Sequence, residues 1–315
     1  MNSSFRGICA VDDNIVWASG SRGTVLRTVN GGNDWEYFAI SGAERLDFRD
    51  VQAFDADNAI VISAGAPAKI FKTINGGLDW KETYSNETQG IFFNSMDFWD
   101  MDNGIAVGDP LDGGFMMIRT ADGGNTWEQV PKENIPAPID GEAQFAASGT
   151  CLIVQGENNV WFATGGGAAR VFRSTDRGDT WTVHETPMIS GEASQGIFSL
   201  AFRDANTGII VGGDYRVDSL GTGNCALTTD GGVTWNLVEG ENRPNGFKSC
   251  VSYLSGYNTN ILVAVGTSGT DISRYSGGTW KILGEEGYHT FSFPENGSTG
   301  WAAGGNGRIA KLILK

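Results

Sequence analysis

Thr120-Ala-Asp122-Gly-Gly124-Asn-Thr126-Trp127 decides the fold, because the chain repeats this eight-residue stretch along its length. We call each copy a box; it reads Ser/Thr-x-Asp/Asn-x-Gly-x-Thr/Asp-Trp. The five clear copies carry an acid or amide at the third position: Asn30, Asn75, Asp122, Asp176 and Asp230. A sixth, altered copy ends at Trp280 and has Tyr275 in place of the acid.

The residue types of the box indicate a tight turn. The Asp or Asn side chain can accept hydrogen bonds from the backbone N–H groups just ahead of it, and the glycines supply positive φ. Apolar, β-prone pairs such as Val25-Leu26 and Val171-Phe172 precede the boxes. Each box therefore joins two antiparallel strands, and its first interpretation is structural.

The spacing of the boxes predicts the architecture. Successive box tryptophans are 45, 47, 54, 54 and 45 residues apart. A period near fifty with room for four strands is typical of a β-propeller. First strands are expected near residues 5, 48, 91, 145, 197, 248 and 289, which gives an all-β, seven-bladed propeller as a single domain over 1–315. The boxes join third and fourth strands.

The last repeat stops before any box. Only four residues precede Phe5, too few for a good strand that would complete the ring from the other terminus. We therefore expect a three-stranded last blade, or a fourth strand supplied by an upstream segment.

Composition excludes several classes of protein. Forty-six glycines and ten tryptophans suit short strands, and no window has a useful helical apolar period. The longest apolar runs, such as 196–202, are strand-sized, so no membrane span is expected. A net charge of −15 argues against a nucleic-acid partner and favours a soluble monomer.

The cysteines and the N-terminus bear on the compartment. The four cysteines lack Cys-x-x-Cys spacing, and we expect buried free thiols. No signal peptide is visible, so the protein is cytoplasmic, or it is periplasmic or secreted and a leader has been removed.

Propeller geometry assigns the remaining loops to faces. Turns between first and second strands share one face with the boxes, while loops between second and third strands and the connectors between blades share the other. The long or irregular segments 109–114, 131–143 and 214–223 lie on that second face. Loop variation on a rigid scaffold is where function normally lies, so we expect the site at the channel mouth on this face.

Several polar residues should gather at this mouth. First strands contribute Arg6, Arg49, Asn94, Lys248 and His289, and loops contribute Asp109, Glu142, Arg170, Asp214, Tyr215 and Asp271. Arginines bind carboxylates in a bidentate manner, so Arg6, Arg49, Arg170, Lys248 and Asp271 form the predicted ligand-binding set.

A catalytic hypothesis uses Tyr215, Asp214, His289, Asp109 and Glu142. Tyr215 beside an acid could act as nucleophile and Asp109 or Asp271 as proton donor, while His289 could be the base of a lyase. The alternative is that these side chains form salt bridges at the mouth or contact a peptide.

No metal or cofactor is predicted. The chain has two histidines, His184 and His289, without ligand partners at a recognised spacing. The stretch 100–104 looks like the start of a calcium loop, but 55–58 and 204–208 occupy the same turn of other blades, which favours an Asx-turn. Gly165-Gly-Gly167 opens no helix that could hold a pyrophosphate.

The boxes and the phrase Arg-Thr-x-Asn/Asp-Gly-Gly-x-x-Trp resemble BNR or Asp-box repeats. More closely, residues 5–312 resemble propellers related to the photosystem II stability and assembly factor. The resemblance implies a binding or assembly scaffold with a protein partner or other ligand at the channel mouth. Asp boxes also occur in sialidases and other glycosidases, so the alternative is an extracytoplasmic carbohydrate-active enzyme, a sialidase-like glycosidase or a lyase, acting on an acidic glycan.

Two features depart from the families that the boxes resemble. The assembly factor has an arginine-rich surface, whereas this chain is acidic. Sialidases carry a Phe/Tyr-Arg-Ile-Pro motif, and the nearest phrase here, Asn134-Ile-Pro136, lacks the arginine.

Overall fold

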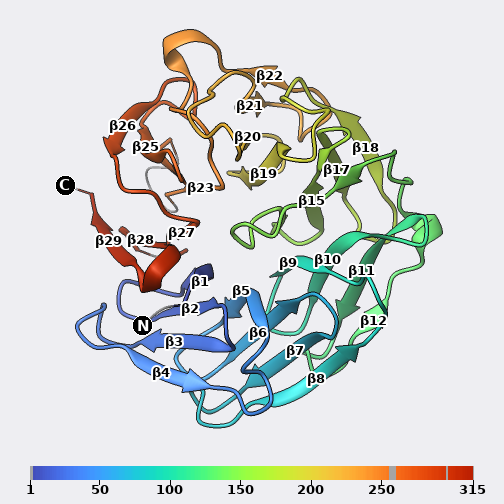
Figure 1. The fold of residues 1–315 in the computed structure, drawn as a ribbon, viewed down its shortest axis with the longest axis vertical. Helices are drawn as coiled ribbons and strands as arrows, with labels where there is room; N and C mark the ends of the chain where they lie inside the picture. The colour runs from blue at the N-terminus through green and yellow to red at the C-terminus, as the bar shows by residue number, and fades with distance from the viewer. Residues whose placement is uncertain (1–2, 255–259, 296, 315) are drawn as a thin grey trace.

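The chain forms a seven-bladed all-β propeller, as the box spacing predicts (Figure 1). The computed structural model describes residues 3–254, 260–295 and 297–314. Its sheets stand radially around one central axis, and the chain visits them in sequence order (Figure 1).

The first three blades each have four antiparallel strands. They are blade 1, β1 (Phe5–Ala10), β2 (Val16–Gly20), β3 (Thr24–Thr28) and β4 (Glu36–Ala39); blade 2, β5 (Asp47–Ala53), β6 (Ala59–Ala64), β7 (Ala68–Thr73) and β8 (Lys81–Asn86); and blade 3, β9 (Phe93–Phe98), β10 (Gly104–Leu111), β11 (Gly114–Thr120) and β12 (Glu128–Gln129).

Blades 4 to 6 follow the same order, with one addition. They are blade 4, β14 (Leu152–Gln155), β15 (Asn159–Ala163), β17 (Arg170–Ser174) and β18 (Thr182–Glu185); blade 5, β19 (Gln195–Phe202), β20 (Gly208–Asp214), β21 (Cys225–Thr228) and β22 (Asn236–Leu237); and blade 6, β23 (Cys250–Tyr253), β24 (Leu262–Gly266), β25 (Gly269–Ser273) and β26 (Lys281–Gly284). The short strands β13 (Glu142–Ala143) and β16 (Gly165–Gly166) extend the inner edge of blade 5.

Blade 7 has three strands, β27 (Thr290–Ser292), β28 (Thr299–Ala303) and β29 (Ile309–Ile313). It meets blade 1 through side contacts. Phe5 N–H donates to Gly304 O at 3.0 Å, and Trp35 packs edge-on against Trp301 with ring centroids 5.7 Å apart. The ring thus closes by packing of two separate sheets.

Apolar side chains fill the spaces between neighbouring blades. All five residues of β2 and of β24 are buried, because the second strand of a blade has a neighbouring blade on each face. One such core joins blades 1 and 2 through Trp17, Phe48 and Val61. This burial on both faces explains why second strands are continuous apolar runs.

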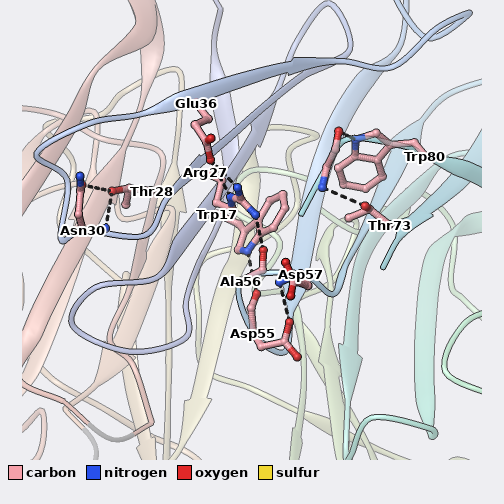
Figure 2. Close-up of polar contacts among 11 residues, drawn as sticks. Trp17, Arg27, Thr28, Asn30, Glu36, Asp55, Ala56, Asp57, Thr73 and Trp80 are labelled. Carbon is pink, nitrogen blue, oxygen red and sulfur yellow. Dashed lines mark hydrogen bonds and ion pairs between the residues drawn. The ribbon is translucent and has the colours of Figure 1, made fainter. Parts of the chain in front are cut away.

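The boxes form the turns expected from their residue types. In the third box, Asp122 accepts the backbone N–H groups of Asn125 and Thr126, and the Thr120 hydroxyl accepts the N–H of Gly124 at 2.8 Å. The second box makes the same threonine contact between Thr73 and Gly77, close to Trp80 (Figure 2). Each box also bonds to its own blade's first turn, as from Gly123 N–H to Asp102 O at 2.8 Å.

The candidate calcium loop is an Asx-turn: Asp100 accepts the N–H groups of Asp102 and Asn103. All four cysteines are free. Among the described residues, no helix has the length and apolar character that crossing a bilayer requires.

The fourth blade corrects one expectation. Its first strand was expected near residue 145, but β14 begins at Leu152. Residues 144–151 instead leave the sheets and enter the channel, where they form part of the candidate site.

Candidate functional site at the channel mouth

Four first strands carry an irregularity at the same place. The register shifts between Phe5 and Gly7, between Phe48 and Asp50, opposite the step from Phe93 to Ser95, and between Ile197 and Ser199. The extra residues are Arg6, Arg49, Asn94 and Phe198. A β-bulge re-aims its extra side chain, and three of these four line one cavity at the channel mouth, while Asn94 hydrogen-bonds to a fourth lining residue, Asp109.

The floor of this cavity is formed by residues 144–147. They are the first half of the segment 144–151, which we call the central segment. It makes hydrogen bonds to the first strand of every other blade. Arg49 donates to Ala146 O at 2.8 Å and Arg6 to Ala147 O at 3.5 Å. Thr290 donates to Ser148 O at 3.0 Å, on the opposite side of the ring.

The second half of the central segment completes this set. Ser95 of β9 donates to Gly149 O, the Thr150 hydroxyl lies 2.7 Å from the Ser199 hydroxyl of β19, and it donates to Cys250 Sγ of β23 at 3.6 Å. The channel is therefore crossed by protein, and the mouth cavity is a dead end.

The mouth cavity has a volume of about 430 Å³. Five of the residues expected at the mouth line it: Arg6, Arg49, Asp109, Tyr215 and His289. Its size is within the range of small-ligand or side-chain pockets.

One side of the cavity is cationic. Arg49 pairs with Asp47 at 2.8 Å, whereas Arg6 forms no ion pair within the described part of the chain. Burial, followed by repulsion from Arg49, lowers the pKa of Arg6 to about 10. Burial and the nearby arginines lower the pKa of His289 to about 4, so its imidazole is neutral at pH 7. Burial is the larger cause of both shifts, and the arginine repulsion that adds to it indicates a place where an added negative charge would be stabilised.

The other side is aromatic. Phe145 of the central segment stacks on Phe198 with ring centroids 3.8 Å apart, and Phe247 meets Phe198 edge-on at 4.7 Å. Tyr215 lies edge-on to both stacked rings at 6.5 and 6.1 Å, and it is 47 % exposed. This wall offers an apolar surface beside the arginines.

Asp109 holds the floor in place. Its carboxylate accepts the N–H of Gln144 at 3.0 Å and the side-chain amide of Asn94 at 2.9 Å, and burial raises its pKa. Asn94 also donates to the Gln144 side chain at 3.2 Å. The carboxylate of Asp109 and the side-chain amide of Asn94 thus connect the central segment to blade 3.

Glu142 and Arg170 bind each other behind the mouth. Their side chains are 0 and 8 % exposed, and Arg170 Nε donates to Glu142 Oε1 at 3.0 Å. Thr164 and the backbone N–H of Ile139 also donate to Glu142.

Gly165 belongs to the adjacent glycine run, where close approach of the Phe145 ring leaves no room for a side chain.

Lys248 and Asp271 form a second buried pair, with Nζ and Oδ2 2.5 Å apart. Burial lowers the pKa of Lys248, and Asp271 opposes that shift.

Asp214 lies outside the mouth cavity and accepts the N–H of Arg216 at 2.9 Å. Burial raises the pKa of Asp214, but its hydrogen bonds outweigh this and bring it below the ordinary value.

Sequence reasoning missed Phe145, Phe198 and Phe247. Phe145 and Phe198 stand beside apolar residues that are typical of strand core, whereas Phe247 stands alone between Gly246 and Lys248. The sequence did contain a signal for Phe198. It stands near the start of the first strand of its blade, as Arg6 and Arg49 do in their blades. Among the described residues, no cluster of three or more His, Cys, Asp or Glu side chains is arranged to hold a metal ion.

Comparisons with known proteins agree on architecture. No protein-family model and no curated protein matches the sequence. Among solved structures, "YCF48 bound to D1 peptide" matches with TM-score 0.71 at 14% identity, over 100% of this chain and 94% of that chain. The likeness shows the fold.

Two further solved structures have the same shape. YCF48 from Cyanidioschyzon merolae matches with TM-score 0.66 at 18% identity, covering 99% of this chain and 96% of that one. The WD40 propeller domain of Doa1 matches with TM-score 0.64 at 16% identity, covering 99% and 93%.

Proposed function

We propose that this protein is a binding propeller that holds a segment of a partner protein at the channel mouth. The observation that carries the proposal is the two-sided cavity, with an arginine that has no ion pair among the described residues opposite a wall of four aromatic rings. Such a surface is complementary to a carboxylate next to an apolar side chain. The solved YCF48 complex with a D1 peptide supports a peptide as the ligand class.

The central segment supports binding over passage through the ring. It closes the channel below the cavity, so a ligand enters and leaves by the same opening. Its hydrogen bonds to all six other blades make the floor rigid, and a preorganised floor lowers the entropy cost of binding.

Geometry within the described residues favours binding over glycan cleavage. A tyrosine nucleophile or histidine base would need a carboxylate within hydrogen-bond reach. Neither the Tyr215 hydroxyl nor the His289 ring hydrogen-bonds to a carboxylate in the described part of the chain. We propose that Glu142–Arg170 and Lys248–Asp271 are structural pairs.

A peptide-display selection followed by calorimetry tests the proposal. Selected peptides should carry an apolar residue beside a carboxylate, and each is measured with a free and with an amidated C-terminus. This comparison separates a chain terminus from an acidic side chain as the group recognised.

Arg6→Gln should weaken binding about tenfold or more, the scale expected for a charge-assisted contact. Arg243→Gln is the matched control, since Arg243 is not among the residues that line the mouth and donates to its own loop at Gly240 O. Equal affinity for Arg6→Gln and wild type would contradict the proposed site. If the protein cleaved an acidic glycan and Tyr215→Phe abolished this activity, the enzymatic function would be favoured over the binding function.

A further inference from the structure

Within the described residues, blade 7 has no fourth strand at its outer edge, where each of the other blades has one. In blades 1 to 6 the third strand pairs with a fourth strand. Within the described part of the chain, β29 pairs with β28 alone. The five residues of β29 therefore present a row of backbone groups that an extended chain can join.

Blade 1 shows what a completed edge looks like. Arg27 of β3 lies opposite Trp17 of β2, with its guanidinium carbon 5.4 Å from the ring centroid. Glu36 of β4 faces Arg27 across the strand pair and accepts from its Nε at 3.0 Å (Figure 2). Two residues later, Phe38 stacks on Trp17 at 6.0 Å.

Blade 7 repeats the inner half of this arrangement. Lys311 of β29 lies opposite Trp301 of β28, with its ammonium 5.2 Å from the ring centroid. Lys311 donates to Gly31 O at 3.1 Å, as Arg27 donates to Ala56 O. The counterparts of Glu36 and Phe38 would stand on the strand that the edge lacks.

Lys311 has no ion-pair partner among the described residues. The carboxylate of Asp13 is within electrostatic range of it. However, one oxygen of Asp13 accepts the backbone N–H groups of Ser298 and Thr299, at 3.0 and 2.9 Å. The lysine ammonium still has donors free for a carboxylate supplied from outside.

A groove accompanies the open edge. A cavity of about 180 Å³ lies between β26 and β29, lined among others by Leu283, Phe291, Ala310 and Leu312. Ala310 and Leu312 line the groove on either side of Lys311, which also lines it and whose ammonium lies beside the Trp301 ring. A residue paired with Ala310 would place its side chain over this apolar floor.

We propose that the outer edge of β29 docks an extended segment of a partner protein with an acidic residue opposite Lys311, followed by an aromatic and then an apolar residue. The order copies Glu36-Tyr37-Phe38 of blade 1, where Tyr37 pairs with Leu26 and Phe38 with Val25. A second copy of this chain is a poorer occupant. Antiparallel self-pairing in full register would oppose Lys311 with itself, and each copy carries a net charge of −15.

This surface is separate from the channel mouth and does not depend on it. The probe is a fluorescent peptide with the sequence of residues 33–41, Asn-Asp-Trp-Glu-Tyr-Phe-Ala-Ile-Ser, blocked at both ends. A second peptide replaces its glutamate by lysine. Binding is measured by anisotropy with the full chain, and amide exchange reports on residues 309–313.

The first peptide should bind wild type and slow exchange in β29. Lys311→Glu should weaken it about 3- to 10-fold and should bind the lysine peptide better than wild type does, as expected for a cross-strand charge pair. Lys281→Glu, an equal charge change at an exposed position of β26, should leave both affinities unchanged.

Three outcomes would overturn the proposal. They are an affinity that Lys311→Glu leaves unchanged, protection in the free protein of those β29 amides that do not donate to β28, and no slowing of their exchange at millimolar peptide. Concentration-dependent dimerisation that Lys311→Glu alters would assign the edge to a second copy instead. Because Lys311→Glu leaves the mouth intact, a negative result here does not affect binding at Arg6.

Discussion

Arg170→Ala should destabilise the protein far more than loss of an exposed ion pair. The substitution leaves Glu142, whose side chain is fully buried, with only Thr164 and the Ile139 N–H as donors. Removing one partner of a buried pair costs about 3–5 kcal/mol, because the remaining charge stays desolvated. Glu142 belongs to β13, which leads directly into the central segment, so the loss falls beside the floor of the mouth.

The corresponding change in melting temperature follows from chain size. An unfolding entropy of about 2.1 cal/mol/K per residue gives roughly 0.66 kcal/mol/K for 315 residues. A loss of about 3–5 kcal/mol therefore lowers Tm by about 5–8 °C. Calorimetry and urea unfolding at pH 7 measure both quantities.

Lys69→Ala is the control. Lys69 pairs with Glu82 at 2.7 Å, but the side chains are 23 and 42 % exposed, so the loss should be below about 1 kcal/mol. The Glu142→Ala, Arg170→Ala double variant should lose at least about 1 kcal/mol less than the sum of the single losses. Equal losses for Arg170→Ala and Lys69→Ala, or strict additivity, would refute the reasoning.

Three further predictions concern buried titratable and box residues. Burial raises the pKa of Asp97 to about 6, so the folded protein binds this proton more tightly than the unfolded chain does. The folded state therefore loses stability as the pH rises from about 4 to about 6. Asp97→Asn removes this loss, so its free energy of unfolding should rise by about 2–3 kcal/mol relative to that of wild type between these pH values, as measured by urea titrations. The two histidines should titrate separately by NMR, with His289 near pH 4; a midpoint near 6.5 would contradict its burial beside arginines. Thr228→Val removes the hydroxyl that accepts the Gly232 N–H at 2.9 Å and should cost about 1–3 kcal/mol, whereas Thr228→Ser should cost less than about 1 kcal/mol in the same unfolding assay.

The fold was predictable because the box is a local signal. Turn chemistry at Asp122 and its counterparts depends on neighbouring residues alone, and the regular spacing of the boxes then sets the number of blades. The missing last box correctly predicted the three-stranded blade. All of this information lies in short stretches of sequence.

The start of blade 4 was not predictable in this way. Residues 145–154 contain two apolar clusters in succession, and either could be a strand by pattern. Long-range hydrogen bonds, such as those of Ser148 and Thr150 to other blades, decide which cluster enters the channel. No local propensity reports such contacts.

The candidate site was predictable in part. Blade position alone brings Arg6, Arg49 and His289 to one opening, and they line the same cavity. Their role in binding stays a prediction. The pairing of Glu142 with Arg170 depends on the path of the loop between them, and the aromatic wall depends on a bulge that turns Phe198 toward the channel.

The central segment also has a consequence for cooperativity. In most radial or stacked repeat proteins each unit touches only its neighbours, so stability is a sum of local terms and unfolding can start in one unit and spread stepwise. Here the eight residues of the central segment hydrogen-bond to the sheets of all six other blades. Loss of any blade thus disturbs an element shared by all the others, and the ring is expected to melt in a single transition, whereas a chain cut between residues 144 and 151 would melt in several.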